Sequence, residues 1–117
     1  MNVVGVQHVA IGVHDVAESI EFYGWLGMTV NPARPEFGFP GAWLFAGQQQ
    51  VHLLESPKKA PGAENHFALI VDDLEACLAD LSARGVDVSN RMHVPGAGKQ
   101  AFLKDPSGNV IELNQPD

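Results

Sequence analysis

Apolar residues fall at every second position in two stretches of the chain, residues 7–13 and residues 66–71. Successive side chains of a β-strand point to opposite faces, so this period of two predicts a strand with one apolar face in each stretch. We place the two strands at residues 3–13 and 66–71. In the first, Val9, Ile11 and Val13 form the apolar face, which we expect to pack on a helix.

Each predicted strand is followed by an acidic residue and then by apolar residues at helical spacing. The first helix is predicted at residues 16–26 and the second at residues 74–84, where Leu74, Leu78 and Leu81 repeat with the helical period. A helix commonly begins at an acidic cap and ends at a glycine. The predicted caps are Asp15 with Glu18 and Asp72 with Glu75 at the starts, and Gly27 and Gly85 at the ends.

The chain repeats itself. Residues 8–15 align with residues 66–73 without a gap, and residues 51–53 align with residues 111–113. The repeat divides the chain into two modules within one domain that spans residues 1–117. We place the modules at residues 3–55 and 65–114, joined by a linker rich in proline, lysine and glycine.

Three shorter strands are predicted after each helix, so each module has the order βαβββ and the fold class is α+β. A turn rich in Pro, Ser, Gly and Asn separates the last two strands of the second module. Residues 31–40 are rich in proline and glycine and carry no assignment. The predicted strands are 29–33, 42–45 and 49–55 in the first module, and 86–90, 99–104 and 109–114 in the second.

Composition narrows the classes of partner. Seven basic residues against fourteen acidic ones give a formal net charge of −7, which argues against nucleic acid and against an anionic membrane surface. The sequence has no apolar run of membrane-spanning length and no secretory leader pattern, so we expect a cytoplasmic protein. Cys77 is the single cysteine, which excludes an intrachain disulfide, and its helical spacing with leucines predicts a buried structural thiol.

Four polar residues share the strand face that points away from the helices: His8, His52, His66 and Glu112. A lone histidine on a strand is more often structural than a ligand, but here the repeat pairs His8 with His66 and His52 with Glu112. If a twofold relates the modules, the four side chains converge. Imidazoles with one carboxylate are typical ligands of Zn, Fe, Ni or Mn, so we predict one divalent metal ion. Strand alternation makes Glu55 a poorer ligand.

The sequence resembles the glyoxalase, bleomycin-resistance and extradiol-dioxygenase superfamily, also called the vicinal oxygen chelate family. The resemblance implies that two βαβββ modules pair into an eight-stranded cup around a metal, with ligands on the first and fourth strands of each module. Those are the positions of His8, His52, His66 and Glu112. The matching stretches are residues 8–11, 19–23, 26–28, 50–55, 66–69, 71–74 and 102–113.

The same resemblance implies a metal-dependent enzyme of the lyase, isomerase or dioxygenase type that acts on a small oxygen-chelating substrate. Glu112 would bind the metal and move a proton, and His52 would be a fourth ligand or a base, with the ligand role favoured. His52 departs from the family pattern, because lactoylglutathione lyases carry Glu at its position. The alternatives are a metal-free antibiotic-binding protein and an accessory subunit without chemistry. Small members of the family usually form homodimers, which we expect here.

Substrate-binding residues are harder to infer. Loop cations can hold a carboxylate or a phosphate, and aromatic residues can line an apolar pocket. For each of these residues taken alone, a solvated surface charge or a core position is the more common role. The candidates are Arg34, Trp43, Arg91, His93, Lys99 and Phe102.

Overall fold

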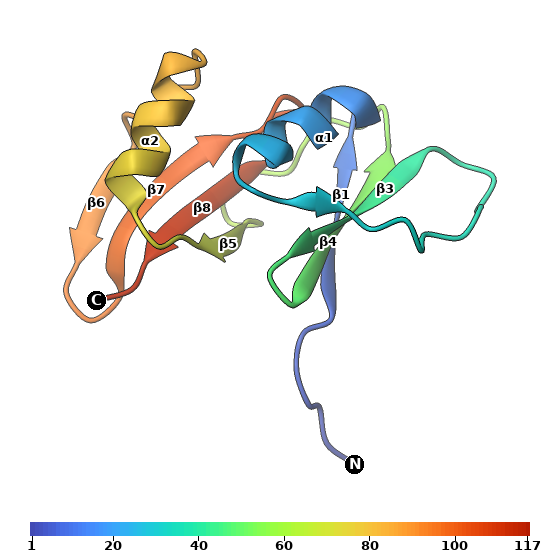
Figure 1. The fold of residues 1–117 in the computed structure, drawn as a ribbon, viewed down its shortest axis with the longest axis horizontal. Coiled ribbons are helices and arrows are strands. Elements are labelled where there is room, and N and C mark those ends of the chain that lie inside the picture. The colour runs from blue at the N-terminus through green and yellow to red at the C-terminus, as the bar shows by residue number, and fades with distance from the viewer. The chain divides into compact units, whose positions relative to one another are not determined.

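The chain folds as two units that repeat one order of elements. The computed structural model describes all residues 1–117 and divides into Met1–Ala60 and Pro61–Asp117 (Figure 1). Each unit has one helix and a four-stranded sheet in the order βαβββ, which confirms the predicted α+β class. The pairing of the two units into a single eight-stranded cup stays a prediction.

In the first unit the first and last strands are parallel neighbours, and the last strand lies inside the sheet. The strand order is β1-β4-β3-β2, and only the β1–β4 pair is parallel. This order places the strand that carries His52 between two neighbours. The elements are β1 (His8–Val13), α1 (Val16–Trp25), β2 (Thr29–Val30), β3 (Gly41–Ala46) and β4 (Gln49–Glu55).

The second unit has the same topology. Its strand order is β5-β8-β7-β6, with β5 and β8 parallel, so the strand that carries Glu112 again lies inside the sheet. Neither helix has the length and apolar character needed to cross a membrane. The elements are β5 (Phe67–Ile70), α2 (Leu74–Ala83), β6 (Arg91–Val94), β7 (Gly98–Lys104) and β8 (Val110–Gln115).

The core of each unit lies between its helix and one face of its sheet. In the first unit Tyr23 of α1 is fully buried with Val51 and Leu53 of β4. In the second unit α2 lies against β7 and β8, as the predicted leucine face requires (Figure 1). The buried leucines and isoleucine of this second core are Leu74, Leu78, Leu81, Leu103, Ile111 and Leu113.

Both helices begin at aspartate caps. The Asp15 carboxylate accepts the backbone N–H of Glu18 at 3.0 Å, as predicted. The prediction of Asp72 as the second cap is wrong, since Asp73 accepts the N–H of Ala76 at 3.0 Å. The N-cap is the residue directly before the first helical residue. Because α2 begins at Leu74, its N-cap is Asp73, which is also the residue that the repeat aligns with Asp15.

The predicted strand at residues 86–90 is also wrong, because β6 is Arg91–Val94. Two local bonds occupy the earlier segment. The Val86 N–H bonds to the Leu81 carbonyl at the end of α2, and the Asp87 carboxylate accepts the Ser89 N–H at 2.9 Å. These bonds make a turn, which competes with a strand ladder, so the strand starts later than its apolar residues suggest.

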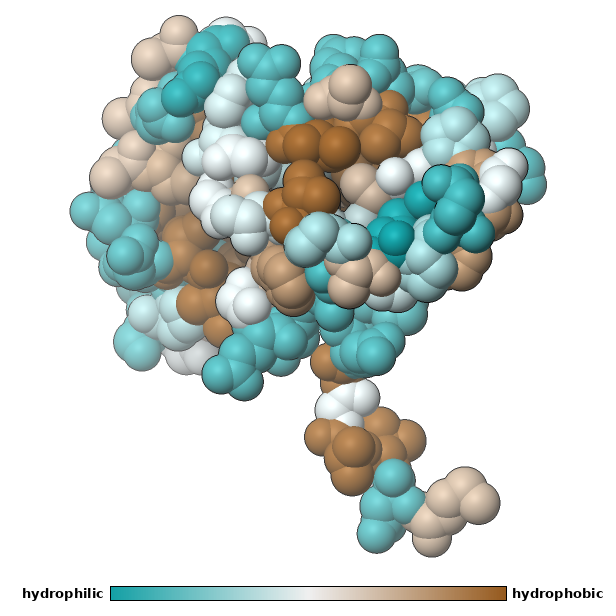
Figure 2. Space-filling model, turned by 45° about the vertical axis from the view of Figure 1, so that its right-hand side comes forward, coloured by the Kyte–Doolittle hydropathy of each residue, from teal (hydrophilic) through white to brown (hydrophobic).

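The first strand is shorter than predicted, since residues 3–7 precede β1. Its parallel partner β4 begins at Gln49, and the Gln50 N–H bonds to the Gln7 carbonyl, so residues 3–6 lie beyond the end of β4. Val3, Val4 and Val6 are therefore exposed, and Figure 2 shows this apolar segment projecting away from the body of the chain. The predicted 29–33 strand likewise ends at Val30, where Asn31 accepts the Ala33 N–H and starts a turn.

The turn between β7 and β8 is built around a buried carboxylate. Asp105 is 4% exposed, and its Oδ1 accepts the backbone N–H groups of Ser107 and Asn109, both at 2.9 Å. Its Oδ2 accepts the Asn109 side-chain amide at 3.0 Å. The predicted turn is confirmed, and it fixes where β8 begins.

Candidate functional site

Strand alternation in the first unit separates core residues from candidate ligands. Along β4, Val51 and Leu53 are buried under α1, and His52 lies on the opposite, open face. In the sheet register His52 stands between Ala10 of β1 and Trp43 of β3. Because alanine is small, the space beside His52 on the β1 side is taken by the next residue on that face, His8.

The His8, His52 and Trp43 rings form a parallel stack. The His8 and His52 ring centroids are 3.8 Å apart at 14°, and the His52 and Trp43 centroids are 4.5 Å apart at 7°. Ring nitrogens of both histidines contact glutamine oxygens, His8 Nδ1 with Gln7 at 2.8 Å and His52 Nε2 with Gln50 at 3.0 Å. A carbonyl oxygen only accepts, so His52 Nε2 donates and its Nδ1 keeps a free lone pair in the neutral ring.

Burial lowers the pKa of His52 from its usual value of 6.5, and the charges of His8 and Arg34 lower it further. Desolvation disfavours the imidazolium, and nearby cations add repulsion. His52 is therefore a neutral imidazole near pH 7, the form that binds a metal or accepts a proton.

This pKa shift predicts a pH-dependent loss of stability. As pH falls below 6.5, the unfolded chain takes up the His52 proton before the folded chain does, so the free energy of unfolding decreases until pH passes the lowered folded pKa. Above pH 6.5 the His52 ring is neutral in both the folded and the unfolded chain, so this loss of stability does not occur. Urea unfolding at about pH 7.5 and about pH 5.5 should show a larger acid loss in the wild type than in His52→Gln. Equal losses in both proteins would contradict the lowered pKa.

The candidate pair in the second unit is His66 and Glu112. His66 directly precedes β5, and its Nδ1 donates to the Ala63 carbonyl at 2.6 Å. This bond assigns the lone pair of the neutral ring to Nε2, which lies 3.3 Å from Glu112 Oε1. The other carboxylate oxygen of Glu112 accepts the Asn114 amide at 3.0 Å.

Glu112 is 9% exposed, and a buried carboxylate needs compensation. When His66 is neutral, its Nε2 lone pair and the Glu112 carboxylate face each other as two acceptors. A proton or a metal cation between them removes the repulsion. The donor set of this pair therefore fits a divalent metal.

Phe102 lies on the same face as this pair. Its partner across the β7–β8 register is Glu112, and its ring meets the His66 ring edge-on at 5.3 Å. Trp43 occupies the corresponding position beside His52 in the first unit. Both aromatic candidates therefore lie next to candidate ligands rather than in the helix-covered cores.

Arg34 belongs to the loop between β2 and β3. Its Nη2 donates to the Phe39 carbonyl at 3.0 Å, and its guanidinium carbon lies 5.0 Å from the Phe37 ring centre and 5.4 Å from that of Phe39. The Phe37 ring in turn lies 6.2 Å from Trp43. Arg34 is thus joined to the His52 face through aromatic rings.

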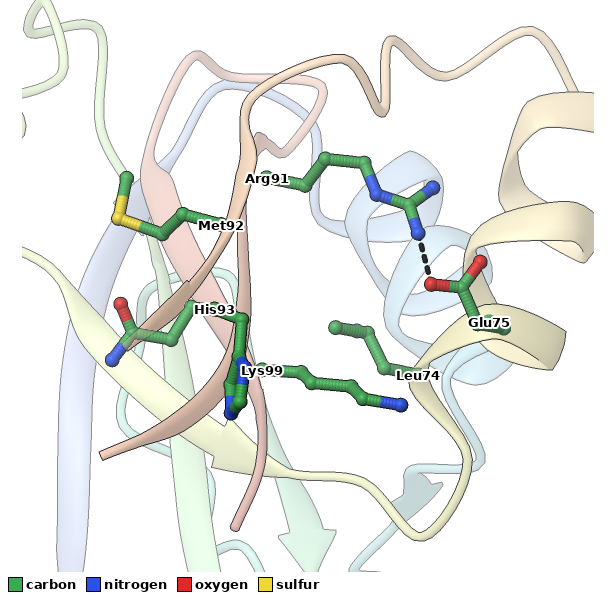
Figure 3. Close-up of a pocket in the computed structure, with 7 residues that line it drawn as sticks. Leu74, Glu75, Arg91, Met92, His93 and Lys99 are labelled. Atoms are coloured by element: carbon green, nitrogen blue, oxygen red, sulfur yellow. Dashed lines mark hydrogen bonds and ion pairs between the residues drawn. The ribbon is translucent and has the colours of Figure 1, made fainter. Parts of the chain in front are cut away.

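Arg91, His93 and Lys99 lie on the other face of their sheet, which α2 covers. Arg91 forms an ion pair with Glu75 of α2, and His93 contacts Asp117 at 2.8 Å. Figure 3 shows Arg91 and Lys99 directed toward α2, around a cavity of about 270 Å³. The three residues do not share a face with Glu112, and two of the three side chains already have acidic partners.

Cys77 is half-buried on α2 rather than fully buried. Burial raises the pKa of its thiol, and the acidic neighbours Asp80, Asp72 and Asp73 raise it further. The thiol therefore stays protonated near pH 7, which agrees with the predicted structural role rather than a nucleophilic one.

Sequence reasoning assigned no role to the amides that hold the candidate ligands. Gln50 and Asn114 lie two residues from His52 and Glu112 on the same strands, and each bonds to that neighbour. The period of two places them on the ligand face, which was the available signal. What the sequence did not show is that their side chains turn along the strand.

The structure brings the four predicted ligands together as two pairs, one in each unit, and gathers no three His, Cys, Asp or Glu residues into a metal-binding group.

The model of the Glyoxalase/Bleomycin resistance protein/Dioxygenase superfamily matches residues 5–113. The chain belongs to this superfamily. The family resemblance found in the sequence is thereby confirmed.

Proteins similar to this chain include some named as lyases and one named as an antibiotic binding protein. A protein of Arabidopsis thaliana named "Glyoxylase I 4" is 28% identical, over 97% of this chain and 71% of that protein. A Vibrio cholerae protein named "Probable lactoylglutathione lyase" is 31% identical, over 92% of this chain and 88% of that protein. The crystal structure of TnmS3, an antibiotic binding protein from Streptomyces sp. CB03234, is 29% identical with a TM-score of 0.82, over 100% of this chain and 99% of that one.

Proposed function

We propose that this glyoxalase-superfamily chain is a metal-dependent enzyme, of the lyase or isomerase type, acting on a small substrate that chelates the metal through oxygen atoms. The relatives named as glyoxalases and lactoylglutathione lyase support the reaction type. The proposed ligands are His8, His66 and Glu112. The ion is one of Zn, Fe, Ni and Mn, all of which accept imidazole and carboxylate ligands.

The observation that carries this proposal is the His66–Glu112 pair. The Ala63 carbonyl fixes the His66 tautomer so that the Nε2 lone pair points to the carboxylate, and the Asn114 amide fixes the other carboxylate oxygen. Metal-binding histidines characteristically donate their second nitrogen to a backbone carbonyl in this way. If His66 and Glu112 had only a structural role, the Nε2 lone pair of His66 would not need to point to the Glu112 carboxylate.

The stacking of His52 on His8 favours a base rather than a fourth ligand. An imidazole would hold a metal through the lone pair of a ring nitrogen, which lies in the plane of the ring. The His8 and His52 rings are nearly parallel, with centroids 3.8 Å apart, so their lone pairs lie in separate planes and do not converge on one point. His52 keeps a free Nδ1 lone pair and a lowered pKa, both of which suit proton acceptance.

The metal would act as a Lewis acid that stabilises negative charge on a substrate oxygen. Glu112 would be one of the residues that hold the ion, with Asn114 orienting its Oε2, and it would take up or return a proton at a carboxylate oxygen. His52 would accept a proton at Nδ1. Trp43 and Phe102, which flank the two pairs, would exclude water from the reacting atoms.

Elemental analysis of protein purified without chelator tests the ligand set. We expect about one divalent ion per chain in the wild type, and at least a roughly 10-fold loss of metal affinity in Glu112→Gln, because one of the few protein ligands is removed. Glu55→Gln is the matched control, since Glu55 is an exposed carboxylate at the end of β4. His52→Gln should retain the metal and lose activity on the substrate.

Three results would count against the proposal. If the wild type takes up no divalent ion after reconstitution, the chain is not a metal enzyme. If Glu55→Gln loses as much metal as Glu112→Gln, the effect is not specific to the site. If His52→Gln releases the ion, then His52 is a ligand and the base has to be sought elsewhere.

The second candidate is a metal-free protein that binds a small molecule such as an antibiotic. The stacked rings of His8, His52 and Trp43 favour it, because they form a flat aromatic surface that needs no ion. The similarity to TnmS3 supports it as well. Ligand binding that is unchanged by chelator and by Glu112→Gln would select this function.

A further inference from the structure

The open face of the first unit carries a continuous series of five aromatic rings from the loop and from strands β3, β4 and β1. Neighbouring ring centres are 5.5, 6.2, 4.5 and 3.8 Å apart along the series. Three of the four ring pairs lie within 19° of parallel. In order, the rings are Phe39, Phe37, Trp43, His52 and His8; we call this set the ring series.

The outer end of the ring series is exposed although it is apolar. Phe37 and Phe39 are 47% and 45% exposed, so a large part of each side chain is in contact with water. The loop that carries them is held at both ends, because the Asn31 N–H bonds to the Trp43 carbonyl and Arg34 bonds to the Phe39 carbonyl. The exposed rings are therefore part of a fixed surface and do not belong to a free tail.

The charge of this face differs from that of the whole chain. The chain has a net charge of −7, yet the strand positions on the open face of this sheet include no carboxylate, and Arg34 supplies a full positive charge beside the outer rings. Gly41 leaves the room for it, since a Cβ there would meet the guanidinium at 2.9 Å. The loop carboxylate, Glu36, is engaged with the Gly38 N–H at 3.4 Å.

We propose that the ring series binds a planar aromatic acid, with the flat ring of the ligand stacked on Phe37, its edge against the tilted Trp43 ring, and its acidic group held by Arg34. The aromatic acid is the class of substrate for the site of the proposed function. Where its reacting oxygen lies rests on that function. Aromatic rings recognise a flat π-system better than a puckered saturated ring of equal size. The guanidinium adds a charged partner for a carboxylate, with further donors beyond the one used by Phe39.

The first test compares three probes with the full-length wild-type chain by isothermal titration calorimetry. The probes are 2-naphthoate, its saturated counterpart decahydro-2-naphthoate and the uncharged 2-naphthamide. We expect 2-naphthoate to bind best, each of the others being weaker by roughly 2- to 10-fold. Equal affinity for 2-naphthoate and decahydro-2-naphthoate, or no binding of 2-naphthoate, overturns the proposal.

The second test compares variants inside and outside the ring series. Phe37→Leu should weaken 2-naphthoate binding roughly 2- to 10-fold while its affinity for decahydro-2-naphthoate changes little. Arg34→Gln should abolish the preference for 2-naphthoate over 2-naphthamide. Phe45→Leu is the control, because Phe45 is an exposed aromatic residue on the same face of β3 that stacks on no other ring. An equal effect of Phe45→Leu and Phe37→Leu overturns the proposal.

The metal content of the same samples separates this inference from the proposed function. Phe37→Leu and Arg34→Gln should keep the metal of the wild type, since neither residue is a proposed ligand. If the wild type holds no metal but still prefers 2-naphthoate, the proposed function fails and the ring series stands. If the metal is present and no preference is found, the ring series fails and the proposed function stands.

Discussion

Leu53→Ala is expected to lower the free energy of unfolding by about 2–5 kcal/mol, whereas Leu54→Ala should lower it by less than about 1 kcal/mol. The two residues are neighbours on β4 and differ in the face they occupy. Leu53 is 1% exposed beneath α1, and Leu54 is 37% exposed on the open face. Truncating Leu53 leaves a cavity in the core, and truncating Leu54 removes contacts that water can replace.

Urea unfolding followed by circular dichroism measures both values. The pair also tests the position of His52, because a one-residue slip of β4 would exchange the two faces and bury the imidazole. Equal costs for the two variants, or a greater cost for Leu54→Ala, would show that the register of β4 differs from the one described here.

Asp105→Ala is expected to cost about 3 kcal/mol of unfolding free energy, which is large for a turn residue. The variant leaves the backbone N–H groups of Ser107 and Asn109, and the Asn109 amide, without the carboxylate that accepts them. Asp105 is also buried, so water cannot easily take its place. The cost therefore includes the desolvation of several donors in addition to the lost bonds.

Asp87→Ala is the control for this prediction. Asp87 bonds with the backbone N–H and the side chain of Ser89 in an exposed turn, where water can replace it, so its loss should be much less damaging than that of Asp105. Thermal and urea unfolding of the two variants and of Asp105→Asn give the comparison, with Asp105→Asn falling between them. If Asp105→Ala is as stable as Asp87→Ala, the buried hydrogen bonds do not hold this turn.

Most of the fold could be predicted because two independent patterns agree. The period of two located the strands, and the internal repeat gave each module the same order of elements. The β6 strand could not be predicted in this way, since the apolar residues Val86 and Val88 lie in a turn fixed by the Asp87 side chain. Such side-chain bonds to the backbone depend on geometry that hydrophobic patterns do not encode.

For the candidate site, the sequence predicted the sheet face on which each residue lies but not the contacts of its side chain. Alternation placed His66 and Glu112 on one face, and the structure brings them within 3.3 Å. Arg91 was a substrate-binding candidate by its charge alone, with a solvated loop charge as the more common role, and the structure pairs it with Glu75 of α2. Whether a cation is free or paired depends on long-range contacts, which a local pattern does not contain. The convergence of all four ligands stays a prediction.

The parallel pairing of first and last strands has a consequence for synthesis on the ribosome. In each unit the central strand, β4 or β8, is the last to emerge, and until it does the earlier strands lack their shared neighbour. Contacts between segments that are distant in the sequence form slowly, because closing the intervening loop costs conformational entropy. The nascent unit therefore exposes unpaired apolar edges until its final strand arrives. The strand that carries His52 or Glu112 is thus also the one that ends the aggregation-prone stage of its unit.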